Sequence, residues 1–334
     1  MDKLKILFMG TPEFGATILR ALANAPEFEV VGVVTQPDRP VGRKNVLTPP
    51  AVKVTAQELG LPVMQVEKLR DPAVLEQLRE FSRGADIFVI AAFGMILPGA
   101  VLEMPRLQCI NVHGSLLPEY RGASPVAQAI LDGKTETGVT IMLMEKGLDT
   151  GPMLSKAVVP IAPAETQPTL MAKVAEAGAK LLLETLPRWA AGELIPEKQD
   201  DSKATFTGII KKEFGLIDWQ QSAAYIERMT RAYDPWPGVF TIWQGQTLKI
   251  LKAKALINER VQGIGPREDS ESDSQAMAGT ALLGQVIGEK GDTLVIATGQ
   301  GWLAPLELQL PGKKLVSVED FLRGQRAIIR ARLG

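Results

Sequence analysis

The feature that most constrains the fold is a regular alternation of short apolar runs with amphipathic segments in the first half of the chain. Lys5–Met9 is a compact apolar run. Phe14, Ile18 and Leu22 follow it at the four-residue spacing of a helix face, and Val30–Thr35 is the next β-branched run. Strands that alternate with helices form a parallel sheet covered on both faces. We therefore expect an α/β domain with a Rossmann-like, doubly wound, mainly parallel sheet.

The same alternation continues as far as residue 186. The expected helices are Val52–Leu59, Pro72–Phe81, one that begins near Ser124, and Thr169–Leu186. The expected strands are Ile87–Ala92, Cys109–Val112, Val139–Met144 and Met153–Ile161.

The pattern changes in the second half of the chain. Trp189–Lys203 is polar and has no periodicity, so we place a linker at residues 191–206, between a catalytic domain of residues 1–190 and a second domain of residues 207–334. A helix at Ala223–Ala232 precedes several short β-rich runs, which predict a small, OB-like β-barrel. These runs are Val239–Trp243, Leu248–Leu251, Ala281–Ile287, Thr293–Ala297 and Leu303–Leu308. Asn258–Ala278 has few apolar residues and is expected to be a loop between barrel strands.

Composition narrows the class of site that the chain can carry. The 334 residues include 37 Lys and Arg against 38 Asp and Glu, a net charge of −1 that gives no general attraction to nucleic acid or membranes. Residues 1–202 carry 20 basic and 24 acidic side chains, and residues 203–334 carry 17 and 14, so the charge shifts from −4 to +3. One cysteine and one histidine leave almost no ligands for zinc, so we expect no metal. The short apolar start ends in a turn and does not resemble an export signal, so we expect a cytoplasmic protein, and we expect a monomer.

The glycines that follow the first strand do not form a nucleotide-binding motif. Gly10 and Gly15 have the spacing of a Walker A loop, but Ala16 and Thr17 stand where Lys and Ser or Thr are needed. The three-glycine turn of a dinucleotide-binding fold is also missing. We therefore expect no nucleotide-dependent chemistry.

The most informative segment is CINVHGSLLPEYRG, residues 109–122, because an apolar strand here carries two polar side chains, Asn111 and His113. Side chains two apart point to the same face of a strand, and the carboxyl ends of parallel strands border the ligand crevice. An amide can donate to the oxyanion of acyl transfer to an amine, and an imidazole can donate or shuttle a proton. The pair is therefore a candidate site for acyl transfer.

Both His113 and Asp149 also have a plainer interpretation. An isolated histidine at a strand end is often a hydrogen-bonded structural residue. Asp149 lies between Gly147 and Gly151, which is typical of a turn residue. Local features leave the structural and catalytic interpretations of His113 open.

A family resemblance bears on that choice. Residues 111–125, NVHGSLLPEYRGASP, closely resemble the NxHxSLLPxxxG signature of the folate-dependent formyltransferases, and ETGVTI at 136–141 and GLDTG at 147–151 resemble the segments that follow it in this family. The resemblance implies that Asn111 and His113 stabilise the developing oxyanion. It also implies that Asp149 accepts or relays the proton of the attacking amine and favours the charged imidazolium.

The resemblance further implies 10-formyltetrahydrofolate as the formyl donor. In this family the pterin lies in a pocket formed largely by main chain, and the matching residues are Phe93, Gly94, Met95, Ile96 and Leu97. The residues that match those approaching the formyl group are Ser115, Leu116, Leu117 and Pro118. The apolar members of both sets could instead be core residues, Met95 above all.

Three accessory features resemble the branch of the family whose formyl acceptor is an aminoacyl-tRNA. They are MGTPEF at residues 9–14, TQPDRPVGRK at 35–44, and DPWPG at 234–238 in the β-rich second domain. The resemblance thus covers essentially the whole chain. It implies transfer of the formyl group to initiator methionyl-tRNA.

The loop at residues 35–44 is a candidate RNA contact. Arg39, Arg43 and Lys44 place three cations on it, and such a loop could become ordered when RNA binds. Lys211 and Lys212 are further candidates for contact with the RNA backbone. A solvated surface loop explains the same charges without a ligand.

Two other functions remain to be distinguished. The same catalytic core could formylate an amino sugar nucleotide or hydrolyse the formylfolate. A protein of another class could retain this fold and bind RNA without catalysis. The polar trio Asn111, His113 and Asp149 argues against the second alternative, because an RNA-binding protein without catalysis has no use for it.

Overall fold

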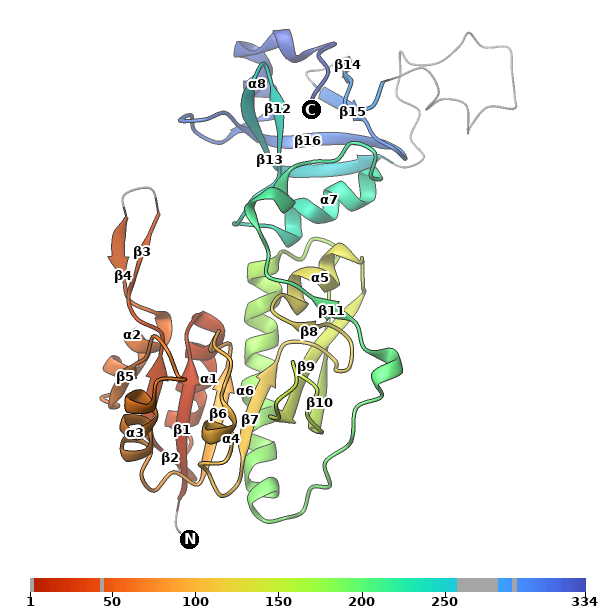
Figure 1. Ribbon diagram of the computed structural model, residues 1–334. Helices are drawn as coiled ribbons and strands as arrows, with labels where there is room; N and C mark the ends of the chain where they lie inside the picture. The colour runs from red at the N-terminus through yellow and green to blue at the C-terminus, as the bar shows by residue number, and fades with distance from the viewer. Residues whose placement is uncertain (1–2, 43–44, 257–281, 290–292) are drawn as a thin grey trace. The chain divides into compact units, whose positions relative to one another are not determined.

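The computed structural model describes residues 3–42, 45–256, 282–289 and 293–334, which form two compact units (Figure 1). The first unit consists of residues up to Val126, Thr135–Ile161 and Thr169–Gly208. The second consists of Ala127–Lys134, Ala162–Pro168 and the described residues from Ile209 onward. Within the described ranges, no helix is both long and apolar enough to span a membrane.

A seven-stranded sheet forms the centre of the first unit, in the order β10-β9-β7-β6-β1-β2-β5. The five strands from β5 to β7 are parallel, whereas β9 is antiparallel to β7 and β10 is antiparallel to β9. The strands are β1 (Leu4–Gly10), β2 (Phe28–Thr35), β5 (Val63–Gln65), β6 (Ile87–Ala91), β7 (Cys109–His113), β9 (Glu136–Leu143) and β10 (Met153–Pro160). The helices of this part of the chain are α1 (Glu13–Asn24), α2 (Ala51–Glu58), α3 (Pro72–Phe81), α4 (Gly99–Leu102), α5 (Pro125–Leu131) and α6 (Gln167–Ala190). The residues of α5 from Ala127 onward and the first two residues of α6 belong to the second unit.

Both faces of this sheet are buried, as the alternation of strands and helices predicted. Leu7 of β1 lies in one core cluster with Leu78 of α3 and Val101 of α4. Ile6 and Phe8 point to the opposite face and are also fully buried. The predicted doubly wound, mainly parallel sheet is therefore confirmed.

The second unit contains an antiparallel sheet that curls into a half-barrel, in the order β12-β13-β16-β15-β14, with β17 paired to β16. The expectation of a small β-barrel-type domain after the α/β domain is therefore confirmed. Its elements are η2 (Lys212–Gly215), α7 (Ala223–Ala232), β12 (Phe240–Trp243), β13 (Gln246–Leu256), β14 (Val286–Glu289), β15 (Thr293–Ala297), β16 (Trp302–Gln309), β17 (Val316–Ser317), α8 (Val318–Gly324) and η4 (Arg326–Ile328).

Helix α7 holds two short segments that precede it in the chain by many residues. Arg228 donates from Nε to the carbonyl of Leu131 over 2.7 Å, and Arg231 donates from Nη1 to the carbonyl of Glu165 over 3.0 Å. These bonds satisfy the main-chain carbonyl of Leu131, the last residue of α5, and that of Glu165. They explain why residues 127–134 and 162–168 belong to the second unit.

The predicted basic loop is in part a β-hairpin. β3 (Arg39–Val41) pairs with β4 (Val46–Thr48) in antiparallel register, so these residues form a hairpin where a loop was expected. Ordering of this segment on RNA binding stays a prediction. At the base of the hairpin, Lys53 donates to both carboxylate oxygens of Asp38 at 2.8 Å. Arg43 and Lys44 lie outside the described residues, as does the predicted loop Asn258–Ala278.

The segment predicted as a linker, residues 191–206, makes specific contacts within the first unit. Glu197 forms a β-bridge with Met153, and η1 (Asp201–Lys203) leads into β11 (Phe206–Thr207). β11 pairs in parallel with β8 (Arg121–Gly122). The polar composition of this segment reflects hydrogen bonding to the first unit. The division into a catalytic and an RNA-binding domain stays a prediction.

The pairing of β8 with β11 leads to a prediction for Gly122. Its φ of +112° lies in the left-handed region, and a Cβ at this position would overlap the carbonyl oxygen of Thr207. We expect Gly122→Ala to lower the free energy of unfolding by about 2 kcal/mol or more. Urea unfolding followed by circular dichroism measures the change.

Gly208→Ala is the matched control, because a Cβ at Gly208 would meet no atom within 4 Å. It should change the free energy of unfolding by no more than about 0.5 kcal/mol. Equal stability of the two variants would contradict the close approach of β8 and β11.

Candidate active site

Asn111 and His113 lie on the same face of β7, at its carboxyl end. All five residues of β7 are buried, and Asn111 and His113 are 9% and 6% exposed. None of the described residues makes a hydrogen bond to the Asn111 side-chain amide. A polar group that is nearly buried and has no protein partner is free to bind a ligand. Asn111 is therefore available as a hydrogen-bond donor at the sheet edge.

The imidazole of His113 is held in one orientation by main chain. Nε2 lies 2.9 Å from the carbonyl oxygen of Tyr120. Because a carbonyl can only accept, Nε2 must carry a hydrogen in this contact. Nδ1 faces the Oδ2 atom of Asp149 at 3.7 Å, which is ion-pair distance when the ring is protonated. The ring thus lies between a main-chain carbonyl and a carboxylate.

Asp149 has an unusual backbone and a fixed carboxylate. Its φ is +51°, in the left-handed region that non-glycine residues rarely occupy. Its Oδ2 accepts a hydrogen bond of 2.8 Å from the N–H of Gly122. The turn interpretation of Asp149 and its place in a site are therefore compatible. The structure brings His113 and Asp149 together and places Asn111 two residues before His113 on β7.

Several residues that the sequence did not single out support this pair. Tyr120 and Gly122 contact His113 and Asp149 as described, and Gln199 donates to the main-chain carbonyls of Asp149 and Gly151. Tyr120 and Gly122 lie inside the family signature, which is a reason to expect them near His113. Gln199 lies in a polar segment with no local signal that distinguishes it.

Cys109 begins β7, but its chemistry differs from that of the polar trio. Its thiol is buried and lies 3.7 Å from the carbonyl oxygen of Val101. Burial raises the pKa of the Cys109 thiol to about 12. The thiol therefore stays protonated at neutral pH and is not a thiolate nucleophile.

The first set of predicted folate residues divides into core and surface. Phe93 and Leu97 are buried in the cluster under β6, and Met95 packs against that cluster. The carbonyl of Phe93 accepts hydrogen bonds from Thr11 Oγ1 at 2.8 Å and from Gln36 Nε2 at 3.0 Å. The side chain of Ile96 is 76% exposed. From this stretch, a ligand could reach main chain, Gly94 and Ile96, while Phe93 and Leu97 act as core.

The second set forms a tight turn after β7. Thr140 Oγ1 donates to the carbonyl of Ser115 at 2.7 Å and accepts from the N–H of Leu117 at 3.1 Å. Ser115 donates from its hydroxyl to the carbonyl of Glu119, and Leu117 is buried with Met142 and Met153. Ser115 and Leu117 therefore shape the turn, while Leu116 and Pro118 are partly exposed.

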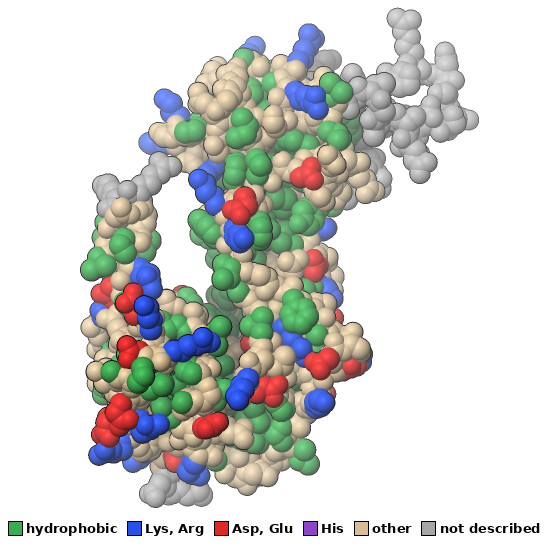
Figure 2. Space-filling view, viewed as in Figure 1, with side chains coloured by type: hydrophobic (Ala, Val, Ile, Leu, Met, Phe, Trp, Pro, Cys, Tyr) green, Lys and Arg blue, Asp and Glu red, His purple; other side chains and the backbone are tan. Residues whose placement is uncertain are grey.

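The described basic candidates are exposed and lie on different units. Arg39 is exposed on the hairpin of the first unit, and Lys211 and Lys212 are exposed in the second. The hairpin also exposes three apolar side chains, Val41, Val46 and Leu47. Figure 2 shows basic side chains spread over the surface, interspersed with apolar ones.

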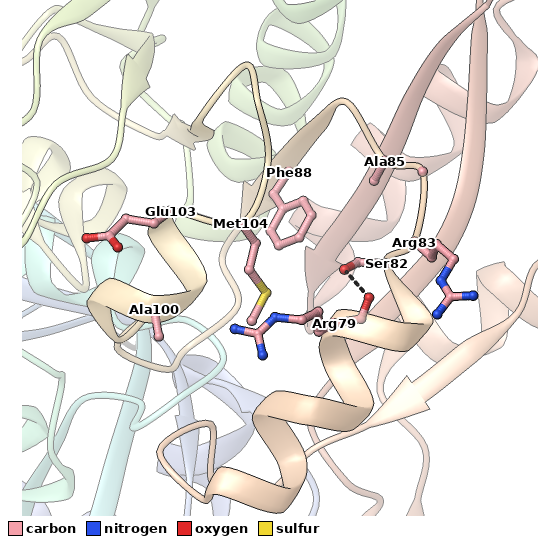
Figure 3. A pocket seen from close by; sticks show the side chains of 9 residues that line it. Arg79, Ser82, Arg83, Ala85, Phe88, Ala100, Glu103 and Met104 are labelled. Carbon is pink, nitrogen blue, oxygen red and sulfur yellow. Dashed lines mark hydrogen bonds between the residues drawn. The ribbon is translucent and has the colours of Figure 1, made fainter.

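A cavity of about 500 Å³ lies elsewhere in the first unit (Figure 3). Its wall includes Arg79 of α3, Arg83 just after that helix, and Phe88, the second residue of β6. Asn111 and His113 lie instead toward the carboxyl end of β7. Both arginines form ion pairs within α3 or just after it, Arg79 with Glu76 and Arg83 with Glu80. With its cations paired and no group of the trio in its wall, this cavity is not the candidate site.

A metal site would need several His, Cys, Asp or Glu side chains close together in the part of the chain that the structure describes. No group of three or more His, Cys, Asp and Glu side chains is placed there to hold an ion. The site consists of an amide, an imidazole and a carboxylate.

Two family models match this chain in succession. Residues 3–186 match the formyl transferase family, and residues 209–326 match the formyl transferase C-terminal domain. Among solved structures, WlaRD, described as a sugar 3N-formyl transferase, has a TM-score of 0.62 at 18% identity and covers 94% of this chain and 100% of that one. HypX from Aquifex aeolicus in complex with tetrahydrofolic acid has a TM-score of 0.57 at 16% identity and covers 96% of this chain and 47% of that one. These two likenesses show the fold.

Sequence relatives are much more similar. A methionyl-tRNA formyltransferase from Chloroflexus aurantiacus is 46% identical over 97% of this chain and 98% of its own length. One from Geobacter metallireducens is 42% identical over the whole of both chains. The chain therefore belongs to the formyl transferase family, and within it to the methionyl-tRNA formyltransferases.

Proposed function

We propose that this chain transfers the formyl group of 10-formyltetrahydrofolate to the amino group of initiator methionyl-tRNA, giving N-formylmethionyl-tRNA for translation initiation. The observation that carries the proposal is the contact of His113 with Asp149 beside the unpaired Asn111 amide, in a chain of this family. An amide, an imidazole and a carboxylate are the groups that acyl transfer to an amine requires.

The reaction needs no covalent enzyme intermediate. The amine lone pair attacks the formyl carbon, and a new C–N bond forms as the formyl oxygen becomes an oxyanion. The attacking nitrogen then loses a proton. The bond from the formyl carbon to N10 of the folate breaks, and N10 takes up a proton. Formylated aminoacyl-tRNA and tetrahydrofolate are the products, with no change of oxidation state.

Each member of the trio has one task in this scheme. The Asn111 amide donates to the formyl oxygen as negative charge develops on it. The His113 ring lies beside the same oxygen as the second polar group on this face of β7. Asp149 takes the proton of the attacking amine, directly or through water. The carboxylate is suited to this task because the Gly122 N–H holds Oδ2 on the side that faces the ring.

The folate pocket that we propose uses main chain more than side chains. Gly94 has no side chain to obstruct a flat ring, and Ile96 offers an exposed apolar surface. Thr11 and Gln36 both bond to the carbonyl of Phe93, which fixes the start of this wall. Leu116 and Pro118 of the turn after β7 complete the apolar lining. A mostly apolar pocket with a few fixed polar groups suits a bicyclic pterin.

The RNA acceptor is supported by the hairpin and the second unit. Arg39 is exposed on β3, where the Lys53–Asp38 ion pair anchors the base of the hairpin. The adjacent exposed apolar side chains could pack against ribose or base surfaces. Arg43 and Lys44 extend the charge of the hairpin in sequence, and Lys211 and Lys212 add cations to the second unit. We propose a catalytic domain up to residue 190, an RNA-binding domain from residue 207, a monomeric state and a cytoplasmic location.

The first experiment measures incorporation of formyl from 10-formyltetrahydrofolate into purified initiator methionyl-tRNA. Elongator methionyl-tRNA, an amino sugar nucleotide and a reaction without acceptor are run beside it. We expect product with the initiator alone. If formylfolate is consumed and no tRNA is labelled, the proposed acyl-transfer site stands. The proposal that methionyl-tRNA is the acceptor is then overturned.

The second prediction concerns the trio. His113→Ala and Asn111→Ala should each lower kcat by about 10²-fold or more, because each removes a group that stabilises the oxyanion. Steady-state kinetics with both substrates at saturation measure the loss. Asn24→Ala, in the exposed end of α1, is the matched control and should keep normal turnover. Normal turnover of either trio variant would contradict the assigned roles.

The third prediction concerns the hairpin. Arg39→Ala should weaken use of the tRNA and reduce the slope of log KM for tRNA against log salt by about one, as expected for the loss of one phosphate contact. The KM for the folate should not change. Arg83→Ala, an exposed arginine of the cavity away from the trio, is the control. An equal rise of the folate KM in Arg39→Ala would contradict an acceptor role.

A further inference from the structure

Three consecutive residues hold the His113–Asp149 pair from one side. The carbonyl of Tyr120 accepts from His113, and the N–H of Gly122 donates to the Asp149 carboxylate. Between them, the guanidinium of Arg121 reaches the same loop through a bridging side chain, Gln199. The main chain of Tyr120 and Gly122 thus contacts both partners of the pair directly, and the side chain of Arg121 reaches Asp149 through Gln199.

Gln199 is the bridge, and its amide can have only one orientation. Its Oε1 accepts from Nε of Arg121 at 3.0 Å, and an arginine can only donate. Its Nε2 therefore faces the aspartate loop, where it donates to the carbonyls of Asp149 at 2.7 Å and Gly151 at 2.8 Å. Gln199 is 4% exposed, so water does not compete freely for these bonds. Both amide hydrogens and the amide oxygen are satisfied.

Arg121 anchors the bridge. Its side chain is buried, and its Nη2 donates to Oδ1 of Asp201 at 2.7 Å. A buried guanidinium requires such partners, since an unpaired one is costly. Gln199 and Asp201 both lie in the segment after α6, and the N–H of Arg121 donates to the carbonyl of Thr205 in the same segment. The segment after α6 therefore forms hydrogen bonds with both the side chain and the main chain of Arg121.

The aspartate loop needs an external support. The φ of +51° at Asp149 is a conformation that a non-glycine residue holds only where its surroundings enforce it. The two bonds from Gln199 hold the carbonyl of Asp149 itself and that of Gly151, two residues later. The hydrogen bond from the Gly122 N–H holds the carboxylate. Gln199 therefore fixes the backbone of Asp149, and Gly122 fixes its side chain.

We infer that Gln199 is a positioning residue, which holds the Asp149 carboxylate against the His113 imidazole by fixing the backbone of the aspartate loop. Gln199 touches no reacting atom. The expected loss of kcat rests on the proposed function. The positioning of Asp149 against His113 does not. The polar segment after α6 is then part of the catalytic apparatus.

The sole histidine of the chain gives a direct test. In protein labelled with ¹⁵N in the histidine ring, the two ring nitrogens of His113 report on the nearby carboxylate without interference. Gln199→Ala should shift these signals. Glu197→Gln is the matched control, because the side chain of Glu197 is exposed and its main chain makes the bridge to Met153. Its spectrum should overlay that of the unsubstituted chain. A Gln199→Ala spectrum that also overlays it would overturn the inference.

The kinetic arm separates positioning from binding. Gln199→Ala should lower kcat by about 10-fold to 10²-fold. This is the loss expected when a catalytic group is displaced by up to about 1 Å. The KM values for folate and tRNA should stay within about twofold, because no substrate contact is lost. A raised KM with unchanged kcat would overturn the inference.

A second variant covers the case in which Gln199→Ala fails to fold. Gln199→Glu keeps the size and the bond to Arg121, but its carboxylate cannot donate to the two carbonyls. We expect the same loss of kcat and the same class of shift in the His113 signals, in protein whose thermal midpoint shows that it is folded. Full turnover of Gln199→Glu would overturn the inference. If the unsubstituted chain formylates no methionyl-tRNA, the proposed function fails, and the ring signals still decide whether Gln199 positions the pair.

Discussion

The hydrogen bond from the His113 ring to the carbonyl of Tyr120 is the contact on which the site depends. Without it, rotation of the side chain could bring either ring nitrogen toward Asp149. Tyr120 itself has a φ of +59°, and its N–H donates to the hydroxyl of Thr205 at 2.8 Å. The ring orientation therefore depends on β7 and also on Thr205, which lies 85 residues after Tyr120 in the chain.

The sheet supplies the other half of the geometry. β7 is buried along its length between β6 and β9, so the positions of Asn111 and His113 are set by a rigid strand. Asp149 comes from the turn that follows β9, the next strand in the sheet order. Because β9 is antiparallel to β7, this turn starts beside Cys109, the first residue of β7, and its later part brings Asp149 to His113. A site built this way keeps its side chains in place before any substrate arrives.

The sequence predicted regular elements well where local signals were strong. α3 and α7 have their predicted bounds, because Asp71 and Ser222 cap their first turns and their apolar residues recur at helical spacing. The pairing of β8 with β11 had no such signal. These strands have two residues each, and they join parts of the chain that are more than 80 residues apart. Polarity at residues 191–206 suggested a linker, although Gln199 is buried there by hydrogen bonds.

The place where the first unit can be divided follows from the same pairing. A fragment that ends at Ala190 retains every strand of the seven-stranded sheet and the whole of α6, together with Asn111, His113 and Asp149. It loses the residues that bind Tyr120, Arg121 and the aspartate loop from outside. Such a piece has all the parts of a folded sheet but only part of a working site. The strands and helices of the first unit's sheet are therefore complete at Ala190, whereas the residues that support the site belong to a segment that ends at Gly208.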